Sequence, residues 1–127
     1  MADKRRKISN RQRLLDFALS LPGAWQDEPW AGDVVAKVGT KIFVFFGGDD
    51  GEAISVKLDE SHAMASAVPG AKPTGYGLGK HGWVLVPITG PDAPELTVIE
   101  DWIEESYAAR ATKKLIAELI ARNESGS

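Results

Sequence analysis

The sequence predicts an α+β fold, a two-layer sandwich in which helices pack on one side of an antiparallel sheet of about five strands. Two observations predict it. Apolar stripes at helical spacing lie near both ends of the chain, and the region between them holds short strand-like runs joined by glycine-rich turns. The resulting order is α-β-β-β-α-β-β-α, and hairpin connections make the early strands antiparallel neighbours.

The first helix is expected to begin at Ser9, because Ser9 and Gln12 have the spacing of a capping box. Pro22 and Gly23 end this helix. Its apolar stripe comprises Leu14, Leu15, Ala18, Leu19 and Leu21. Residues 24–32 contain two tryptophans and a proline among acidic residues, so we expect a loop there whose rings tuck against the body.

Three strands are expected next, over residues 33–38, 41–46 and 53–58. Gly39-Thr40 forms the turn of the first hairpin, and the connection before the third strand is rich in glycine and aspartate, which suit positive φ. Polar and apolar residues alternate in the third strand, which places Lys57 on the face that points away from the core.

Asp59 is a candidate N-cap for a short helix that ends near Ala67. A strand or extended turn is then expected around Tyr76, followed by a strand over residues 83–88. Trp83 begins that strand and is expected to face the helices. Stacking of Trp83 on a nucleic-acid base is the alternative interpretation.

The spacing of Asp92 and Glu95 predicts a capping box at the start of the last helix. A second helical segment follows a bend near residues 111–112. The last helix also carries four acidic residues, which we interpret as a solvated face. They are Glu100, Asp101, Glu104 and Glu105.

The chain of 127 residues fits one domain, over residues 9–122, with a flexible basic tail at residues 1–8 and a disordered end at residues 123–127. It has no cysteine, which excludes disulfides and thiolate metal sites. We expect neither a metal nor a cofactor. The sequence has no pattern of a secretory signal or a membrane span, and we expect a cytoplasmic protein without a membrane partner.

The net charge of −3 is unevenly distributed along the chain. Residues 1–13 carry six cations against Asp3, a local charge of +5 that leaves −8 for the rest. The body of the protein is therefore acidic. A uniformly basic surface for nucleic acid is not expected.

Four glycines between residues 75 and 82 surround Lys80 and His81. Glycines permit a tight turn with free backbone N–H groups, and cations beside such a turn can hold an anion such as a phosphate. The alternative interpretation is an ordinary solvated lysine. For His81 alone, a structural hydrogen bond or simple exposure is favoured over catalysis.

Five strings in this order resemble the MmcQ/YjbR-like family over roughly residues 12–120. They lie at residues 21–23, 37–43, 55–59, 80–84 and 103–107. The resemblance implies a frataxin-like (CyaY-like) fold and a "double wing" DNA-binding motif in a small bacterial protein. The residues that match the family pattern directly are Lys57, Lys80, Trp83 and Tyr107. His81 lies one residue before the place of the usual histidine, which is glycine here.

The leading functional hypothesis is a non-enzymatic DNA-binding module, since no catalytic motif is present. Cations on the sheet face and the glycine-rich loop would meet the phosphates. They are Lys37, Lys41, Lys57, Lys80 and His81. A protein-interaction or small-anion-binding adaptor that uses the same face is the alternative, favoured by the acidity of the body. Strand lysines that only blunt edge pairing are a third interpretation.

Overall fold

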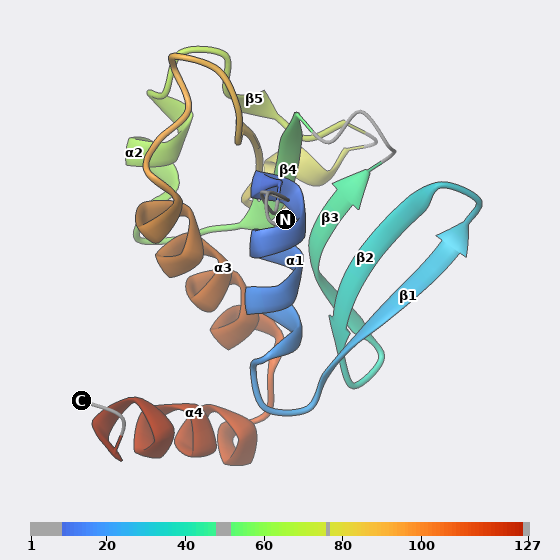
Figure 1. Ribbon diagram of the computed structural model, residues 1–127, viewed down its shortest axis with the longest axis vertical. Helices are drawn as coiled ribbons and strands as arrows, with labels where there is room; N and C mark the ends of the chain where they lie inside the picture. Colours follow the sequence, from blue (N-terminus) through green and yellow to red (C-terminus); the bar gives the residue numbers. More distant parts are fainter. Residues whose placement is uncertain (1–8, 48–51, 76, 126–127) are drawn as a thin grey trace, which may run out of the picture.

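The computed structural model describes residues 9–47, 52–75 and 77–125. Its centre is a six-stranded antiparallel sheet with the strand order β1-β2-β3-β4-β6-β5 (Figure 1). The strands are β1 (Ala24–Trp30), β2 (Asp33–Val38), β3 (Lys41–Gly47), β4 (Ala53–Lys57), β5 (Lys72–Pro73) and β6 (Trp83–Pro87). The predicted α+β class and antiparallel sheet are confirmed. The extended segment expected around Tyr76 has its centre outside the described residues.

The loop predicted over residues 24–32 is wrong, because most of it forms the edge strand β1. Side chains hold this strand to β2. Trp25 donates a 3.0 Å hydrogen bond from Nε1 to the Gly39 carbonyl, and Asp27 pairs with Lys37 at 3.0 Å. Pro29 has no backbone N–H to donate. It is tolerated because β1 is an edge strand and Pro29 lies where the register of the β1–β2 pairing shifts.

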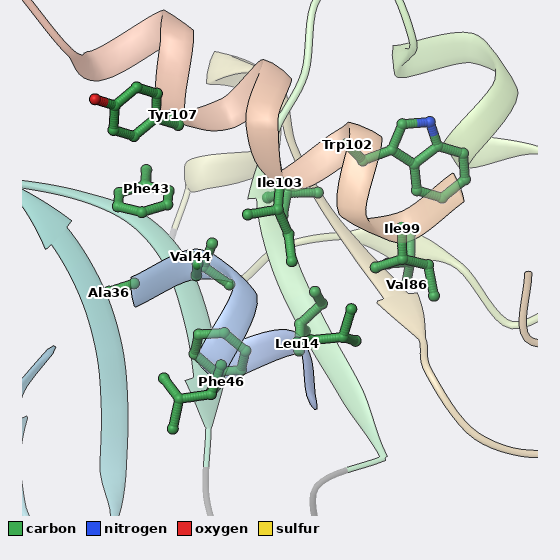
Figure 2. Close-up of a cluster of buried hydrophobic side chains, with 14 of the residues drawn as sticks. Leu14, Ala36, Phe43, Val44, Phe46, Val86, Ile99, Trp102, Ile103 and Tyr107 are labelled. Atoms are coloured by element: carbon green, nitrogen blue, oxygen red, sulfur yellow. The ribbon is translucent and has the colours of Figure 1, made fainter. Parts of the chain in front are cut away.

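Helices α1 (Asn10–Leu19) and α3 (Leu96–Arg110) pack on one face of the sheet (Figure 1). Figure 2 shows their contribution to the core, with Ile99, Trp102, Ile103 and Tyr107 of α3 lying over side chains of the strands. The Tyr107 ring meets Phe43 edge-on at 5.4 Å, and its hydroxyl donates to the Pro22 carbonyl. Tyr107 therefore ties α3 to both the sheet and the end of α1.

The buried hydroxyl of Ser106 joins α3 to the sheet at a point where two strands separate. The β3–β4 pairing includes Val44 opposite Val56, and Phe43 and Lys57 are the next opposing positions. There the Ser106 hydroxyl donates to the Phe43 carbonyl at 2.5 Å and accepts from the Lys57 N–H at 2.8 Å. The Ser106 side chain thus provides hydrogen-bond partners for two backbone groups that do not pair with each other because the strands have separated.

The caps of the helices agree with the sequence only in part. Ser9 caps α1 as predicted, since its hydroxyl accepts from the Gln12 N–H at 3.0 Å. The Asp92–Glu95 capping box is wrong, because Glu95 is the N-cap of α3 and makes no side-chain capping bond. Asp59 is not an N-cap either, because α2 (His62–Ser66) begins after Ser61.

Glu105 of α3 takes over the role predicted for Asp59. Its Oε2 accepts from the backbone N–H groups of Asp59 at 2.8 Å and Ser61 at 3.1 Å, just before α2. Desolvation raises the pKa of Glu105, but hydrogen bonds from the Ser61 side chain and the neighbouring backbone outweigh it and hold the pKa below its ordinary value of 4.5.

We expect this carboxylate to make the protein sensitive to acid. A group whose pKa is lower in the folded than in the unfolded chain contributes stability above its unfolded pKa and loses it as the pH falls through the folded pKa. In Glu105→Gln, the difference in unfolding free energy from the wild type should therefore shrink from about pH 6 to about pH 3. Urea titrations across this range measure it.

Glu104→Gln is the matched control for the acid prediction. Burial and the neighbouring Asp101 raise the pKa of Glu104, so its proton binding favours the folded state as the pH falls. Removing Glu104 should therefore make the loss of stability in acid steeper, whereas removing Glu105 makes it shallower. The same slope in both variants would contradict the assignment.

Helix α4 (Lys113–Ser125) follows the predicted bend and lies beside the end of α1 (Figure 1). Its contacts to the body are few. Leu119 is buried, Leu115 lies against Gly23, and Arg122 donates to the Ser20 carbonyl. The helix includes residues 123–125, which the sequence assigned to a disordered end.

Candidate ligand-binding face

The face of the sheet opposite α1 and α3 carries a second set of side chains. Alternation along a strand sends neighbouring residues to opposite faces, and paired residues share a face. On β4, Ile54 and Val56 belong to the helical core, so Ser55 and Lys57 point to the other side. Through the pairing, that open face also holds Trp30, Asp33, Val35, Lys37, Phe45, Trp83 and Leu85.

Trp83 lies on this open face, so its predicted orientation toward the helices is wrong. It pairs with Lys57, and its ring meets Phe45 edge-on with centroids 5.2 Å apart. Only 5% of Trp83 is exposed, although it is not part of the helical core cluster. Val35, opposite Phe45, is fully buried on the same side. The open face thus has a small apolar core of its own.

Beside this small core lies a pocket of about 850 Å³. Its described lining is mostly apolar, with Trp30 at one side and Phe45 and Leu85 on the sheet surface. Among the described residues, the lining consists of Trp30, Asp33, Phe45, Ser55, Thr74, Gly75, Leu78 and Leu85. Pockets of this size, apolar with a few polar groups, are typical of sites for small organic molecules. Trp30 is 62% exposed, so a large apolar ring is left in contact with water.

Two kinds of polar group line the pocket. The Thr74 hydroxyl lies 3.0 Å from the Ser55 hydroxyl, and hydroxyls in such a pair keep capacity for further hydrogen bonds. Asp33 is half-buried and lies opposite Trp30 in the β1–β2 pairing. Within the described part of the chain, no ion pair or side-chain hydrogen bond engages Asp33.

Two of the predicted site lysines already have partners. Lys37 pairs with Asp27 and lies over the Trp25 ring, with its Nζ 4.9 Å from the ring centroid. Lys57 lies on the open face as predicted, but its Nζ donates to the His81 carbonyl. The charge of Lys37 is thus compensated by Asp27, whereas the Lys57 ammonium keeps two further donors for a phosphate.

The other three predicted residues are exposed but do not lie together on one face. Lys41 stands at the tip of the β2–β3 hairpin opposite Val38, whose side chain belongs to the helical core. Lys80 and His81 end a short 3₁₀ helix, η1 (Leu78–His81), between β5 and β6. The structure therefore joins Lys57 to the Lys80-His81 loop, places Lys37 on the same face two strands away on β2, and leaves Lys41 apart at the hairpin tip.

Steric contacts explain why two positions of this loop are glycine. Gly82 has φ +91°, and a Cβ placed there would lie 2.8 Å from the Leu58 carbonyl oxygen. A Cβ at Gly79 would lie 2.7 Å from Cβ of Pro73. Gly82, which stands at the place of the family's usual histidine, and Gly79 are thus positions where this loop conformation has no room for a side chain.

The acidic face of α3 is only partly free. Glu100 accepts from Arg13 of α1 at 3.1 Å, and Glu105 holds the segment before α2. Among the described residues, no group of three or more potential metal ligands is gathered. Nor is any helix in the described ranges long and apolar enough to cross a lipid bilayer.

Comparisons with known proteins give a family and a similar solved structure. A family model described as YjbR matches residues 19–109. The crystal structure of a Deinococcus radiodurans protein with a DUF419 family-model domain is similar, with a TM-score of 0.66 and 25% sequence identity over 84% of each chain. No curated protein matches the chain. Helix α4 lies outside the matched residues, whereas the sheet, the pocket and the loop lie within them.

Proposed function

The chain belongs to the YjbR family, and from this premise we propose that it is a non-enzymatic binding module whose ligand occupies the pocket on the open face of its sheet. The single observation that carries the proposal is the apolar pocket of about 850 Å³ beside the exposed ring of Trp30. YjbR is not a known enzyme family. The pocket also lacks a nucleophile paired with a histidine among its described residues, which suits binding without catalysis.

The arrangement of the sheet supports this function physically. The helices stabilise the fold from one side, so the open face is not needed to close the main core. A rigid β-sheet surface holds Phe45 and Leu85 in place, and a ligand that covers them removes apolar area from water. Each 100 Å² of apolar surface covered contributes roughly 2.5 kcal/mol before the costs of association.

Binding of DNA is the second candidate, favoured by the exposed Lys80 and His81 beside the positive-φ glycines of their loop. Lys57 could join them through the ammonium donors that the His81 carbonyl leaves free. The body is acidic, and Lys37 is neutralised by Asp27. These two features favour the pocket over a surface that binds the phosphates of DNA as the main site.

Two tryptophans on β1 allow a matched test of the pocket. Both lie on the open face, but Trp30 lines the pocket and Trp25 contacts Lys37 and Gly39 instead. The probe is 2-(1-naphthyl)ethanol, a neutral aromatic molecule, titrated by two-dimensional NMR. Trp30→Ala should weaken its binding about tenfold, as the loss of one aromatic wall predicts, and Trp25→Ala should leave it unchanged.

Trp30→Ala, together with Lys80→Ala, also distinguishes binding in the pocket from binding of DNA at the loop. A DNA-binding surface at the loop predicts that Lys80→Ala weakens binding of a DNA duplex at low salt and that Trp30→Ala does not. Equal naphthyl binding in the wild type and in Trp30→Ala, or none in the wild type, would reject the pocket as the ligand site. Absence of duplex binding at low salt would reject the DNA function.

A further inference from the structure

The charge at the rim of the pocket indicates which ligands it can accept. Asp33 is the only charged residue in its described lining. Three lysines lie on the open face, and none is part of the described lining. Lys37 is paired with Asp27, and Lys57 donates to the His81 carbonyl. Lys72 of β5 pairs with Leu85 at the pocket and is exposed. An anion entering this pocket would meet a carboxylate and no lining cation.

Asp33 and Trp30 face one another across the turn that joins β1 to β2. Glu28 is occupied in holding this turn, since its Oε2 accepts from the Gly32 N–H at 2.8 Å. A carboxylate without a partner beside the exposed face of an indole is the pair of groups that attracts an ammonium ion, by charge and by the ring quadrupole.

We propose that the pocket selects an organic amine, a small molecule with an apolar or aromatic body and a protonated amino group. The apolar body lies on Phe45, Leu78 and Leu85, and the ammonium group lies between Asp33 and Trp30. The hydroxyls of Ser55 and Thr74 hydrogen-bond polar groups at the opposite side. This inference rests on the proposed function, because it names the ligand class of the same site.

Its test uses three probes that share one ring and differ in charge. They are the cation 2-(1-naphthyl)ethylammonium, the neutral 2-(1-naphthyl)ethanol and the carboxylate anion 1-naphthaleneacetate. Each is titrated by NMR or calorimetry at low salt. The wild type should bind the amine about five- to tenfold more tightly than the alcohol, the size expected of one exposed cation–π contact with one partly solvated carboxylate. The acetate should bind weakest. Added salt should reduce the preference for the amine.

Two variants localise the charge preference. Asp33→Asn should reduce the preference for the amine over the alcohol to the part contributed by the Trp30 ring, and it should leave the affinity of the alcohol unchanged. Asp27→Asn is the control, because Asp27 is also on the open face but is paired with Lys37 away from the pocket. If Asp33→Asn fails to fold, the order of the three probes on the wild type still decides.

The outcomes separate this inference from the proposed function. Equal binding of all three probes, or tightest binding of the acetate, overturns the amine ligand but keeps the pocket as a binding site. A preference for the amine that is as large in Asp33→Asn as in the wild type also overturns it. Binding of none of the probes overturns both proposals.

Discussion

Replacing Gly82 by alanine is expected to destabilise the protein by about 2–4 kcal/mol, through backbone strain and a steric clash together. Gly82 has φ +91°, a conformation that side chains disfavour, and its Cβ would stand 2.8 Å from the Leu58 carbonyl oxygen. The Gly82 carbonyl also accepts from the Leu58 N–H at 2.9 Å. The clash must therefore push apart two segments that a hydrogen bond holds together.

Gly90→Ala is a closely matched control. Gly90 has φ +89°, nearly the same strain, but a Cβ there meets no atom within 4 Å among the described residues. Its loss should be about 1–2 kcal/mol. Urea unfolding of both variants gives the two values, and their difference isolates the contact with Leu58. An equal loss in the two variants would show that the close approach to Leu58 carries no cost.

Replacing Ser106 by alanine is expected to cost about 2–4 kcal/mol, because it leaves two buried backbone groups without partners. The Phe43 carbonyl loses its donor and the Lys57 N–H loses its acceptor. Water has little access there, since Ser106 is fully buried. Thermal and urea unfolding measure the loss.

Ser55→Ala is the control for this second prediction. Ser55 is also buried, with 4% exposure, but among the described residues its side chain makes a hydrogen bond only with the Thr74 hydroxyl. Its loss should be about 1 kcal/mol, as for a single hydrogen bond. If Ser106→Ala costs no more than Ser55→Ala, the hydroxyl does not bridge β3 and β4 in solution.

The local signals of the sequence predicted the elements that local chemistry controls. Ser9 caps α1, the Gly39-Thr40 turn forms its hairpin, and Lys57 points away from the helical core. Strand β1 was missed because acidic residues and Pro29 disfavour a strand locally. Its contacts with Gly39 and Lys37 of the β2–β3 hairpin form only in the folded sheet.

The pocket could not be predicted from the residues in order. Its walls come from β1, β2, β3, β4, β6, η1 and the segment 74–75, and they meet because β4 pairs on one side with β3 and on the other with β6, not with β5, the next strand in sequence. One sequence signal was present: Phe45 lies between Val44 and Phe46, so the strand has large apolar residues on both faces. The partners of the predicted lysines likewise depend on register, which sequence spacing does not fix.

Alternate residues of a strand lie on opposite faces of the sheet, so one set packs against the helices and the other set lies on the open face. Ile54 and Val56 are buried against the helices, whereas Ser55 between them lines the pocket. Under the proposed function, adjacent positions on β4 therefore serve different purposes, one set folding and the other recognition of the ligand. Relatives with the same helical layer can be expected to bind different molecules, so a ligand found for one of them does not transfer to another without comparing the open-face residues.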